Sequence, residues 1–202
     1  WNTSGGCELS WLNDNLVVLF NDYSSGERLL SFVGVNDVDR TADTLLDFAA
    51  QHGMAPELRL LPEVTARAIS ARLGRWLLWS PEHDDYVLST SDWSAMAGKS
   101  FRNKRNEISR FQREHHPVCR LIDLGDPAVA AAVMDVFGRW AVTRQYADRA
   151  STTTEALAVR RVFSLHRPGD LLAFGVYVDG DLVAYSINER LPDGYAMGHH
   201  WK

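Results

Sequence analysis

The sequence predicts an α+β protein built from two similarly organised halves, each with a mainly antiparallel sheet flanked by helices. Three strand-like segments occupy residues 8–34 and three more occupy residues 171–202, with helical patterns between them. Short turns separate the neighbouring segments, which favours antiparallel pairing within each group. No sequence repeat relates the two groups, and only their organisation repeats. We therefore expect one half in residues 1–96, the other in residues 97–202, and a cleft where they meet.

The first half opens with the segment ELSWLNDNLVVLFNDYSSGERLLSFVG, in which the turn-forming clusters NDN and SSG separate three strands. An amphipathic helix follows, with Asp39 or Thr41 near its start and Gly53 at its end. The remaining predicted elements are a strand LRLLP, a helix EVTARAISAR, and two strands RWLLWS and DYVLST.

The second half begins with two predicted helices. Asp92 starts a short one, and Ser100 starts a longer basic one that ends near His115. The strand CRLIDL comes next, followed by helices at about 127–145 and 153–165. The closing segments LLAFGVYVDG, DLVAYSINER and GYAMGHHWK predict three antiparallel strands joined by DG and PDG turns.

The composition is that of a soluble globular chain, with 46% hydrophobic and 23% charged residues among 202. Cys7 and Cys119 lie far apart and form no CxxC motif, so we expect reduced, buried thiols, a cytoplasmic location, and neither a disulfide nor a zinc site. Four tryptophans are expected in the core rather than at a nucleic-acid surface, and these are Trp76, Trp79, Trp93 and Trp140.

The longest apolar run has about eight residues, well short of the roughly 20 that a transmembrane helix needs. Peripheral contact with a membrane stays compatible with the sequence. The chain starts at Trp1 and stops at Lys202 inside a predicted strand. We therefore expect a fragment whose second half is incomplete at the C-terminus.

A short basic segment contrasts with the rest of this acidic chain. Residues 99–114 hold six basic residues against two acidic ones, a balance of +4 in a chain of net charge −5. Most of these cations, including Arg102, Arg110 and Arg113, fall on the open face of the predicted helix, which is what a solvated helix surface normally shows, and contact with a polyanion is the alternative.

Two cations of this helix fall elsewhere. At about 100° per residue, Lys104 lies within a stripe expected to be buried, and Arg105 lies on its edge. The apolar members of that stripe are Phe101, Ile108 and Phe111. A lysine there needs either a path along which its ammonium can reach water or an anionic partner, which is a carboxylate of the protein or the phosphate or carboxylate of a ligand in the cleft.

The segment DYVLSTSDWSAMAGKSFRNKRNEISRFQREHHP resembles the hallmark of the domain of unknown function 2156 group. That group is similar to the catalytic domain of bacterial phosphatidylglycerol lysyltransferases and, more distantly, to the Fem aminoacyl-tRNA-dependent transferases. The resemblance implies two GNAT-like halves in tandem, an aminoacyl-tRNA donor, a lipid or small amine acceptor, and no bound cofactor. It centres on Lys104, Arg105 and Asn106, which together with Arg102 and His200 become candidate substrate-binding residues.

In the lysyltransferases that the sequence resembles, the late strand carries an acid and, three residues later, an arginine near the reacting amine. His199 and Lys202 fall at those places and become candidate catalytic residues. Strict alternation along the strand puts His199 and His200 on opposite faces, so they form no two-histidine metal site, and we expect no metal. Either imidazole can deprotonate an amine near neutral pH, unless it is a partly buried histidine whose hydrogen bonds are satisfied within the protein. Glu189 is a candidate base or ammonium ligand, unless it pairs with Arg190 on the surface.

The identity of the donor stays open between two classes. Acetyltransferases of the GNAT type bind the pyrophosphate of coenzyme A on a loop of the form Gln/Arg-x-x-Gly-x-Gly/Ala, which does not occur in this sequence. At the corresponding place in the first half, Asp37 and Asp39 would repel a phosphate. The equivalent loop of the second half is expected beyond Lys202. The missing loop and these two aspartates, together with the family resemblance, favour aminoacyl-tRNA over acetyl-CoA as the donor.

Three functions are compatible with these observations. The favoured one is an aminoacyl or acyl transferase whose acceptor is an amine, a hydroxyl or a lipid headgroup. The second is a coenzyme A-dependent acetyltransferase. The third is a binding module that keeps the fold and its basic helix but carries out no reaction.

Overall fold

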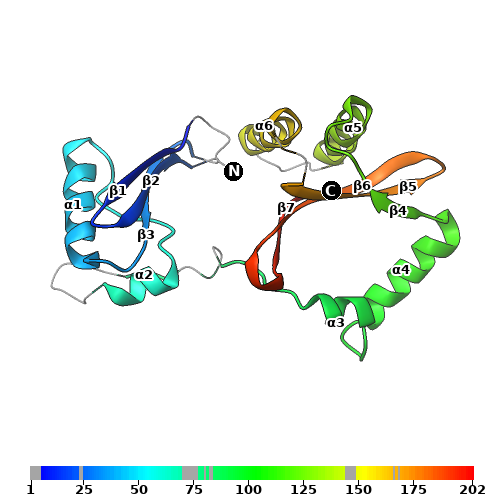
Figure 1. The fold of residues 1–202 in the computed structure, drawn as a ribbon. Helices are drawn as coiled ribbons and strands as arrows, with labels where there is room; N and C mark the ends of the chain where they lie inside the picture. Colours follow the sequence, from blue (N-terminus) through cyan, green and yellow to red (C-terminus); the bar gives the residue numbers. More distant parts are fainter. Residues whose placement is uncertain are drawn as a thin grey trace. The chain divides into compact units, whose positions relative to one another are not determined.

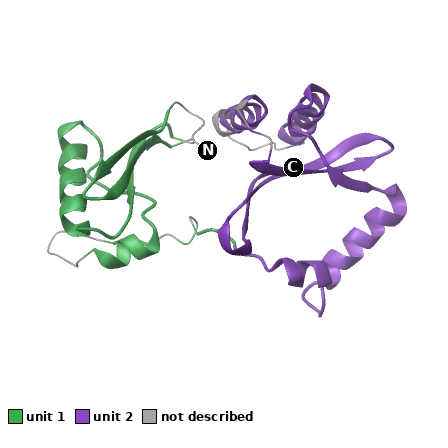
Figure 2. Ribbon diagram, in the orientation of Figure 1, with its two compact units in different colours: residues 1–86 green, residues 87–202 purple. Residues whose placement is uncertain are grey.

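The computed structural model describes most of the 202 residues. The described ranges are 6–22, 25–69, 77–79, 81, 84–143, 149–165, 167 and 169–202. The chain forms two compact units, residues 1–86 and residues 87–202 (Figures 1 and 2). Among the described residues, one unit has a sheet of three antiparallel strands, the other has a sheet of four, and helices flank both. The predicted α+β class is confirmed, in an arrangement consistent with two GNAT-like halves.

The first unit packs a helix against a three-stranded meander. Strands β1 (Glu8–Leu12), β2 (Asn15–Asn21) and β3 (Arg28–Val33) pair in that order, each antiparallel to the next. Helices α1 (Val38–Gln51) and α2 (Glu63–Ala68) follow. Alternate residues of the strands face α1, so that Leu19 and Phe32 pack with Leu45 in one apolar cluster. The three strands and the helix were predicted from the sequence.

A buried amide ties the parts of the first unit together. Asn15 is fully buried at the start of β2. Its Nδ2 donates to the carbonyl of Asn36 at 2.6 Å and to Oγ1 of Thr41 at 3.0 Å, and its Oδ1 accepts from the amide of Asn36 at 3.1 Å. Gly34, at a φ of 142°, leaves room for this side chain, since a Cβ there would collide with it. The β1–β2 turn is therefore fixed to the start of α1.

The second unit covers one face of its sheet with two helices. Strands β4 (Val118–Leu121), β5 (Leu171–Val178), β6 (Asp181–Arg190) and β7 (Ala196–Trp201) pair antiparallel in that order. Helices α5 (Pro127–Thr143) and α6 (Arg149–Leu165) connect β4 to β5 and lie side by side over the sheet (Figure 1). Preceding β4 are α3 (Thr90–Ala95) and α4 (Arg102–His115).

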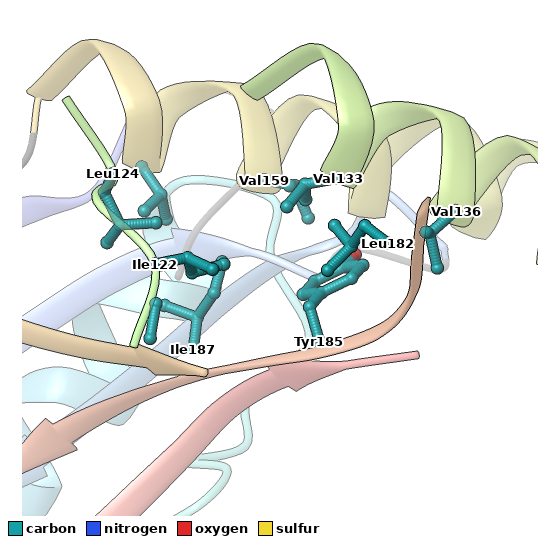
Figure 3. Close-up of a cluster of buried hydrophobic side chains, with 10 residues drawn as sticks. Ile122, Leu124, Val133, Val136, Val159, Leu182, Tyr185 and Ile187 are labelled. Atoms are coloured by element: carbon teal, nitrogen blue, oxygen red, sulfur yellow. The ribbon is translucent and has the colours of Figure 1, made fainter. Parts of the chain in front are cut away.

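The core of the second unit lies between these two helices and the sheet. Val133 of α5, Val159 of α6 and Ile187 of β6 are completely buried there (Figure 3). The β5–β6 hairpin turns at Asp179 and Gly180, with φ values of 53° and 91°, as the predicted DG turn requires. A 3-10 turn (Pro192–Gly194) connects β6 to β7.

Several local predictions were wrong. Residues 58–62 form no strand, and Leu60 has a φ of 55°, which is incompatible with one. The segment DYVLST forms no strand either, since residues 85–89 are irregular and Thr90 begins α3. Neither sheet includes this segment, and Tyr86 and Val87 are 95% and 79% exposed. The RWLLWS strand lies partly outside the described residues, and residues 77–79 show no strand.

The predictions for cysteine and tryptophan need correction as well. Cys7 and Cys119 are free thiols as predicted, but both are exposed rather than buried. Trp79 and Trp93 are 75% and 40% exposed, so neither belongs to a core. Trp76 lies outside the described residues.

Candidate functional site

A β-bulge distinguishes the closing strand. Ile187 of β6 lies opposite His200, and the next residue of β6, Asn188, lies opposite Gly198. His199 is therefore an extra residue on β7 with no partner position on β6. Bulges re-aim side chains and are over-represented next to active sites. The strict alternation predicted for this strand is thus wrong at His199, and contacts rather than alternation define where each histidine points.

The bulged histidine contacts a carboxylate of the neighbouring strand. Nε2 of His199 lies 2.7 Å from Oε2 of Glu189, so two of the predicted catalytic residues are brought together. The imidazole is 10% exposed, whereas the carboxylate is 44% exposed. Because a carboxylate only accepts hydrogen bonds, the contact fixes the proton of a neutral ring on Nε2. The pair therefore consists of a shielded donor and a carboxylate that solvent or a substrate can reach. The surface pairing of Glu189 with Arg190 is not seen among the described contacts.

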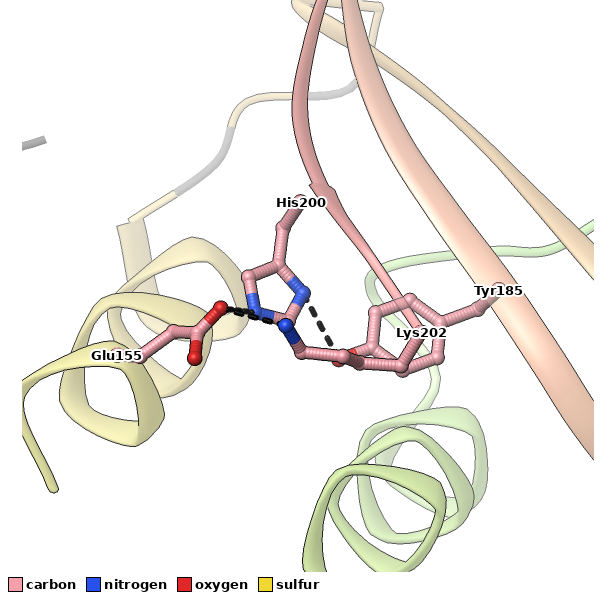
Figure 4. Close-up of polar contacts among 4 residues, drawn as sticks. All are labelled: Glu155, Tyr185, His200 and Lys202. Atoms are coloured by element: carbon pink, nitrogen blue, oxygen red, sulfur yellow. Dashed lines mark hydrogen bonds and ion pairs between the residues drawn. The ribbon is translucent and has the colours of Figure 1, made fainter. Parts of the chain in front are cut away.

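A second group of polar side chains lies under α6. Oε1 of Glu155 lies 2.7 Å from Nζ of Lys202 and 3.0 Å from Nε2 of His200 (Figure 4). The other ring nitrogen of His200, Nδ1, is 2.9 Å from the hydroxyl of Tyr185. The ammonium of Lys202 also lies 3.5 Å from the centre of the Trp140 ring, within cation–π range. Side chains from α5, α6, β6 and β7 meet in this group.

Burial sets the protonation of the second group. His200 is 5% exposed, and burial lowers its pKa from 6.5 to about 4, with the carboxylate of Glu155 opposing the shift and the ammonium of Lys202 adding to it. Burial also raises the pKa of Tyr185, and Glu155 adds to that shift. At neutral pH the tyrosine therefore stays protonated and can donate to Nδ1 of a neutral imidazole.

This leaves the imidazole proton on Nε2, facing Glu155. That nitrogen lies within ion-pair distance of the carboxylate but has no well-oriented hydrogen bond. The group contains one carboxylate and one ammonium, so its charges balance while His200 is neutral.

The two groups are separate sites. The backbones of Tyr185 and Lys202 bond to each other, at 2.9 and 3.1 Å, so Lys202 lies beside Tyr185 on β6. Glu189 is four residues further along that strand, about 13 Å at roughly 3.3 Å per residue. The structure therefore joins Glu189 with His199 and joins Lys202 with His200, but it does not bring all of the predicted catalytic residues to one point.

The basic helix α4 begins at Arg102, two residues after the predicted start at Ser100, and the burial predicted for its apolar stripe is not found within this unit. None of its residues is buried, and Ile108 and Phe111 are 38% and 39% exposed. Lys104 is 58% exposed and lies 3.5 Å from Glu107, one turn away on the same helix. The apolar stripe is present as predicted, but within the described residues of this unit only its first residue is partly covered, because the ring of Trp93 packs edge-to-face on Phe101 with 5.5 Å between ring centroids.

The other predicted binding residues of this region have different surroundings. Arg105 is half-buried and its guanidinium donates to the carbonyls of Met96 and Gly98, the latter at 2.9 Å. It therefore fastens the end of α3 to the start of α4. Arg102 and Asn106 are exposed. Contact of any of these side chains with a ligand stays a prediction.

Sequence reasoning missed three members of the second group, namely Glu155, Tyr185 and Trp140. A signal for Glu155 was present, because it precedes the buried residues Ala158 and Val159 by three and four positions on α6 and so shares their face. A carboxylate on a buried helix face calls for a cationic partner. Tyr185 and Trp140 become members only through packing between distant segments, for which no local pattern exists.

No metal site or membrane span emerges from the described part of the chain. There, no group of three or more His, Cys, Asp or Glu side chains is placed to hold a metal ion. None of the described helices is both long and apolar enough to cross a bilayer.

Comparisons with known proteins give one family and one similar structure. The sequence matches the family described as "Phosphatidylglycerol lysyltransferase, C-terminal" over residues 1–200. No curated protein matches it. A crystal structure of a conserved protein of unknown function from Bacteroides thetaiotaomicron is similar, with a TM-score of 0.68 and 19% identity over 90% of this chain. The chain spans 61% of the length of that protein, and at this identity the likeness supports the fold alone.

Proposed function

The chain belongs to the phosphatidylglycerol lysyltransferase C-terminal family, and we propose that it catalyses transfer of an aminoacyl group from aminoacyl-tRNA to an amine, hydroxyl or lipid headgroup. The family favours the lipid headgroup among these acceptors. The observation that carries the proposal beyond family membership is the Glu189–His199 pair, which offers an accessible carboxylate held by a shielded imidazole.

Aminoacyl transfer needs a base near the acceptor. The nucleophilic nitrogen or oxygen of the acceptor attacks the carbonyl carbon of the aminoacyl ester and loses a proton as the new bond forms. The carboxylate of Glu189, 44% exposed, takes that proton, while Nε2–H of His199 keeps it oriented. When the carbon–oxygen bond to the tRNA ribose breaks, the proton passes to the leaving ribose oxygen, and the carboxylate is restored.

The surface of α4 supports a polyanionic donor. Arg102, Arg110 and Arg113 are exposed on this helix. Nucleic-acid phosphates bind exposed cationic side chains that are not already held in buried ion pairs. Lys202 lies with the second group instead, and a direct role for it at the reacting atoms stays a prediction.

The test compares donors and variants in one assay. Transfer of label from aminoacyl-tRNA to phosphatidylglycerol vesicles or to a soluble amine is measured for the full-length protein, with acetyl-CoA as the competing donor. We expect transfer from aminoacyl-tRNA only, and a loss of about 10²-fold or more in kcat for Glu189→Gln, with little change in melting temperature. Arg190→Gln, an exposed neighbour, is the matched control.

Other outcomes would select the competing functions. Label transferred from acetyl-CoA and not from aminoacyl-tRNA would identify a coenzyme A-dependent acetyltransferase. Full activity of Glu189→Gln would remove this carboxylate from the chemistry. Binding of aminoacyl-tRNA without transfer to any acceptor would favour a binding module.

A further inference from the structure

The bulge at His199 is followed at once by two anchored residues. His200 contacts both Tyr185 and Glu155, and Lys202 contacts Glu155 and the ring of Trp140. Both side chains are nearly buried, at 5% and 12% exposure. Glu155 is the member of the group that holds both of them, through one oxygen atom.

We propose that Glu155 is a positioning residue for His199. By holding His200 and Lys202 against α6, its carboxylate fixes the end of β7, keeps the bulge at His199, and so keeps the imidazole of His199 on the carboxylate of Glu189. The consequence for catalysis rests on the proposed function, whereas the geometric consequence does not.

The argument begins with the register of β7. A bulge adds one residue to one strand, and a shift of register by one residue turns every side chain to the opposite face of a sheet. Before the bulge, β7 is paired through Met197 with Glu189. After it, the backbone of Lys202 is paired with Tyr185. The bulge can only stay at His199 if this second pairing is held.

The side chains of the residues that follow the bulge keep this second pairing in place. Backbone bonds alone do not select a register, because every register forms similar ones. Glu155 does select one, since only in the observed register do the ammonium of Lys202 and Nε2 of His200 both reach its Oε1. A register shifted by one residue would turn the side chains of Lys202 and His200 away from α6. The half-buried carboxylate of Glu155 would then lose both partners.

Charge adds to this selection. The ammonium of Lys202 is 12% exposed and has one carboxylate partner among the described contacts. Removal of that carboxylate leaves a nearly buried cation uncompensated, which favours release of the strand end into water. Glu155→Gln keeps the shape of the side chain and removes only the charge, so it tests the hold on the strand without creating a cavity.

The test reads the His199 ring directly by nuclear magnetic resonance. With ¹⁵N-labelled histidine, the ring nitrogen shifts give the tautomer of His199, and the Nε2 proton gives its exchange rate with water. Glu189→Gln defines the signature of a weakened contact. We expect Glu155→Gln to reproduce it, with exchange of the Nε2 proton about tenfold faster, as suits loss of one hydrogen bond to a charged group.

A control variant separates positioning from general loosening. Arg139→Gln removes a hydrogen bond of 3.0 Å from α5 to the carbonyl of Leu182, in the same layer but away from β7. It should leave the His199 signals unchanged. If Glu155→Gln does not fold, Lys202→Met offers the same test from the other partner. Glu155→Asp should restore part of the wild-type signature.

The outcomes are distinct. An unchanged tautomer and exchange rate of His199 in folded Glu155→Gln overturns the proposal. The same shift in Arg139→Gln overturns it too, because the effect would then be general. A changed His199 signature combined with no transfer activity in the wild-type protein would leave the positioning role standing and defeat the proposed function.

Discussion

At the scale of single residues, one oxygen atom organises the second polar group. Oε1 of Glu155 lies within 3.0 Å of both an ammonium and an imidazole nitrogen. A single half-buried carboxylate balances a single cation, so a second cation in the same place would be unfavourable. His200 accordingly stays neutral, and its pKa is lowered to about 4 mainly by burial. The protonation of His200 is thereby linked to the stability of the fold.

The first prediction follows from that linkage. Between pH 6.5 and pH 4 the unfolded chain binds a proton at His200 that the folded chain does not. Stability that is present above pH 6.5 is therefore lost as the pH falls towards 4, by about 3 kcal/mol at 1.36 kcal/mol per unit. Urea unfolding gives the free energy of unfolding of the wild type and of His200→Gln at each pH. The wild-type value minus the variant value should fall by that amount as the pH is lowered from 6.5 to 4. A difference that is constant with pH would contradict the assignment.

A second residue-scale prediction concerns Asn15. Replacing this fully buried residue by alanine removes its two hydrogen bonds to the backbone of Asn36 and its bond to Thr41, and each such bond contributes about 0.5–1.5 kcal/mol. We expect Asn15→Ala to lower the free energy of unfolding of the first unit by roughly 3 kcal/mol. Ser10→Ala, an exposed change on the adjacent strand β1, serves as the control and should change little.

At the scale of elements, local patterns predicted what depends on local structure. The meander of β1, β2 and β3, helix α1, and the closing strands of the second unit all follow from alternation and turn residues close together in sequence. LRLLP and DYVLST have equally strong strand composition, yet neither pairs with another strand. A segment of high strand propensity forms a strand only where another strand is available to pair with it, and the position of that second strand depends on distant parts of the chain.

The same limit explains the outcome for the predicted site. Periodicity located the apolar stripe of α4 correctly, but periodicity does not say what packs against a stripe, and its expected burial is not found within this unit. Applied to α6, the same reasoning would have found Glu155 beside Val159 on the buried face. The contact of His199 with Glu189 depends on a bulge, which shifts one strand by a residue and leaves no mark in the sequence.

The junction between α3 and α4 gives the third prediction. Arg105 donates to two carbonyls there, whereas Lys104 is exposed and paired only within its own helix. Arg105→Met should therefore lower the free energy of unfolding by about 1–2 kcal/mol, and Lys104→Met should change it by less than about 0.5 kcal/mol. Thermal unfolding of both variants checks this.

Activity of the same variants tests the predicted binding role. If Lys104 holds the anionic part of the donor, Lys104→Met lowers kcat/KM about tenfold while the melting temperature stays the same. Normal turnover in Lys104→Met would assign this lysine to the solvated surface.

At the scale of the whole molecule, the distribution of charge is uneven. The chain has a net charge of −5, yet residues 99–114 carry +4. An acidic protein repels a polyanion over most of its surface, so a polyanionic donor can approach favourably only where the cations gather. Because the helix that carries them has no buried residue, its exposed arginines Arg102, Arg110 and Arg113 are available for such contact.

The last prediction uses salt to measure that contact. Each nucleic-acid phosphate that a cation neutralises adds about 0.7 to 0.9 to the slope of log affinity against log salt. Replacing Arg102, Arg110 and Arg113 together by alanine should therefore flatten the slope for tRNA binding by up to about 2 to 3. The fold should survive, because all three side chains are exposed. A triple replacement of exposed Arg160, Arg161 and Arg190, which lie outside the basic helix, controls for the change in net charge. Equal flattening by both triples would show that net charge alone acts, whereas flattening by the first triple alone would assign the tRNA contact to α4.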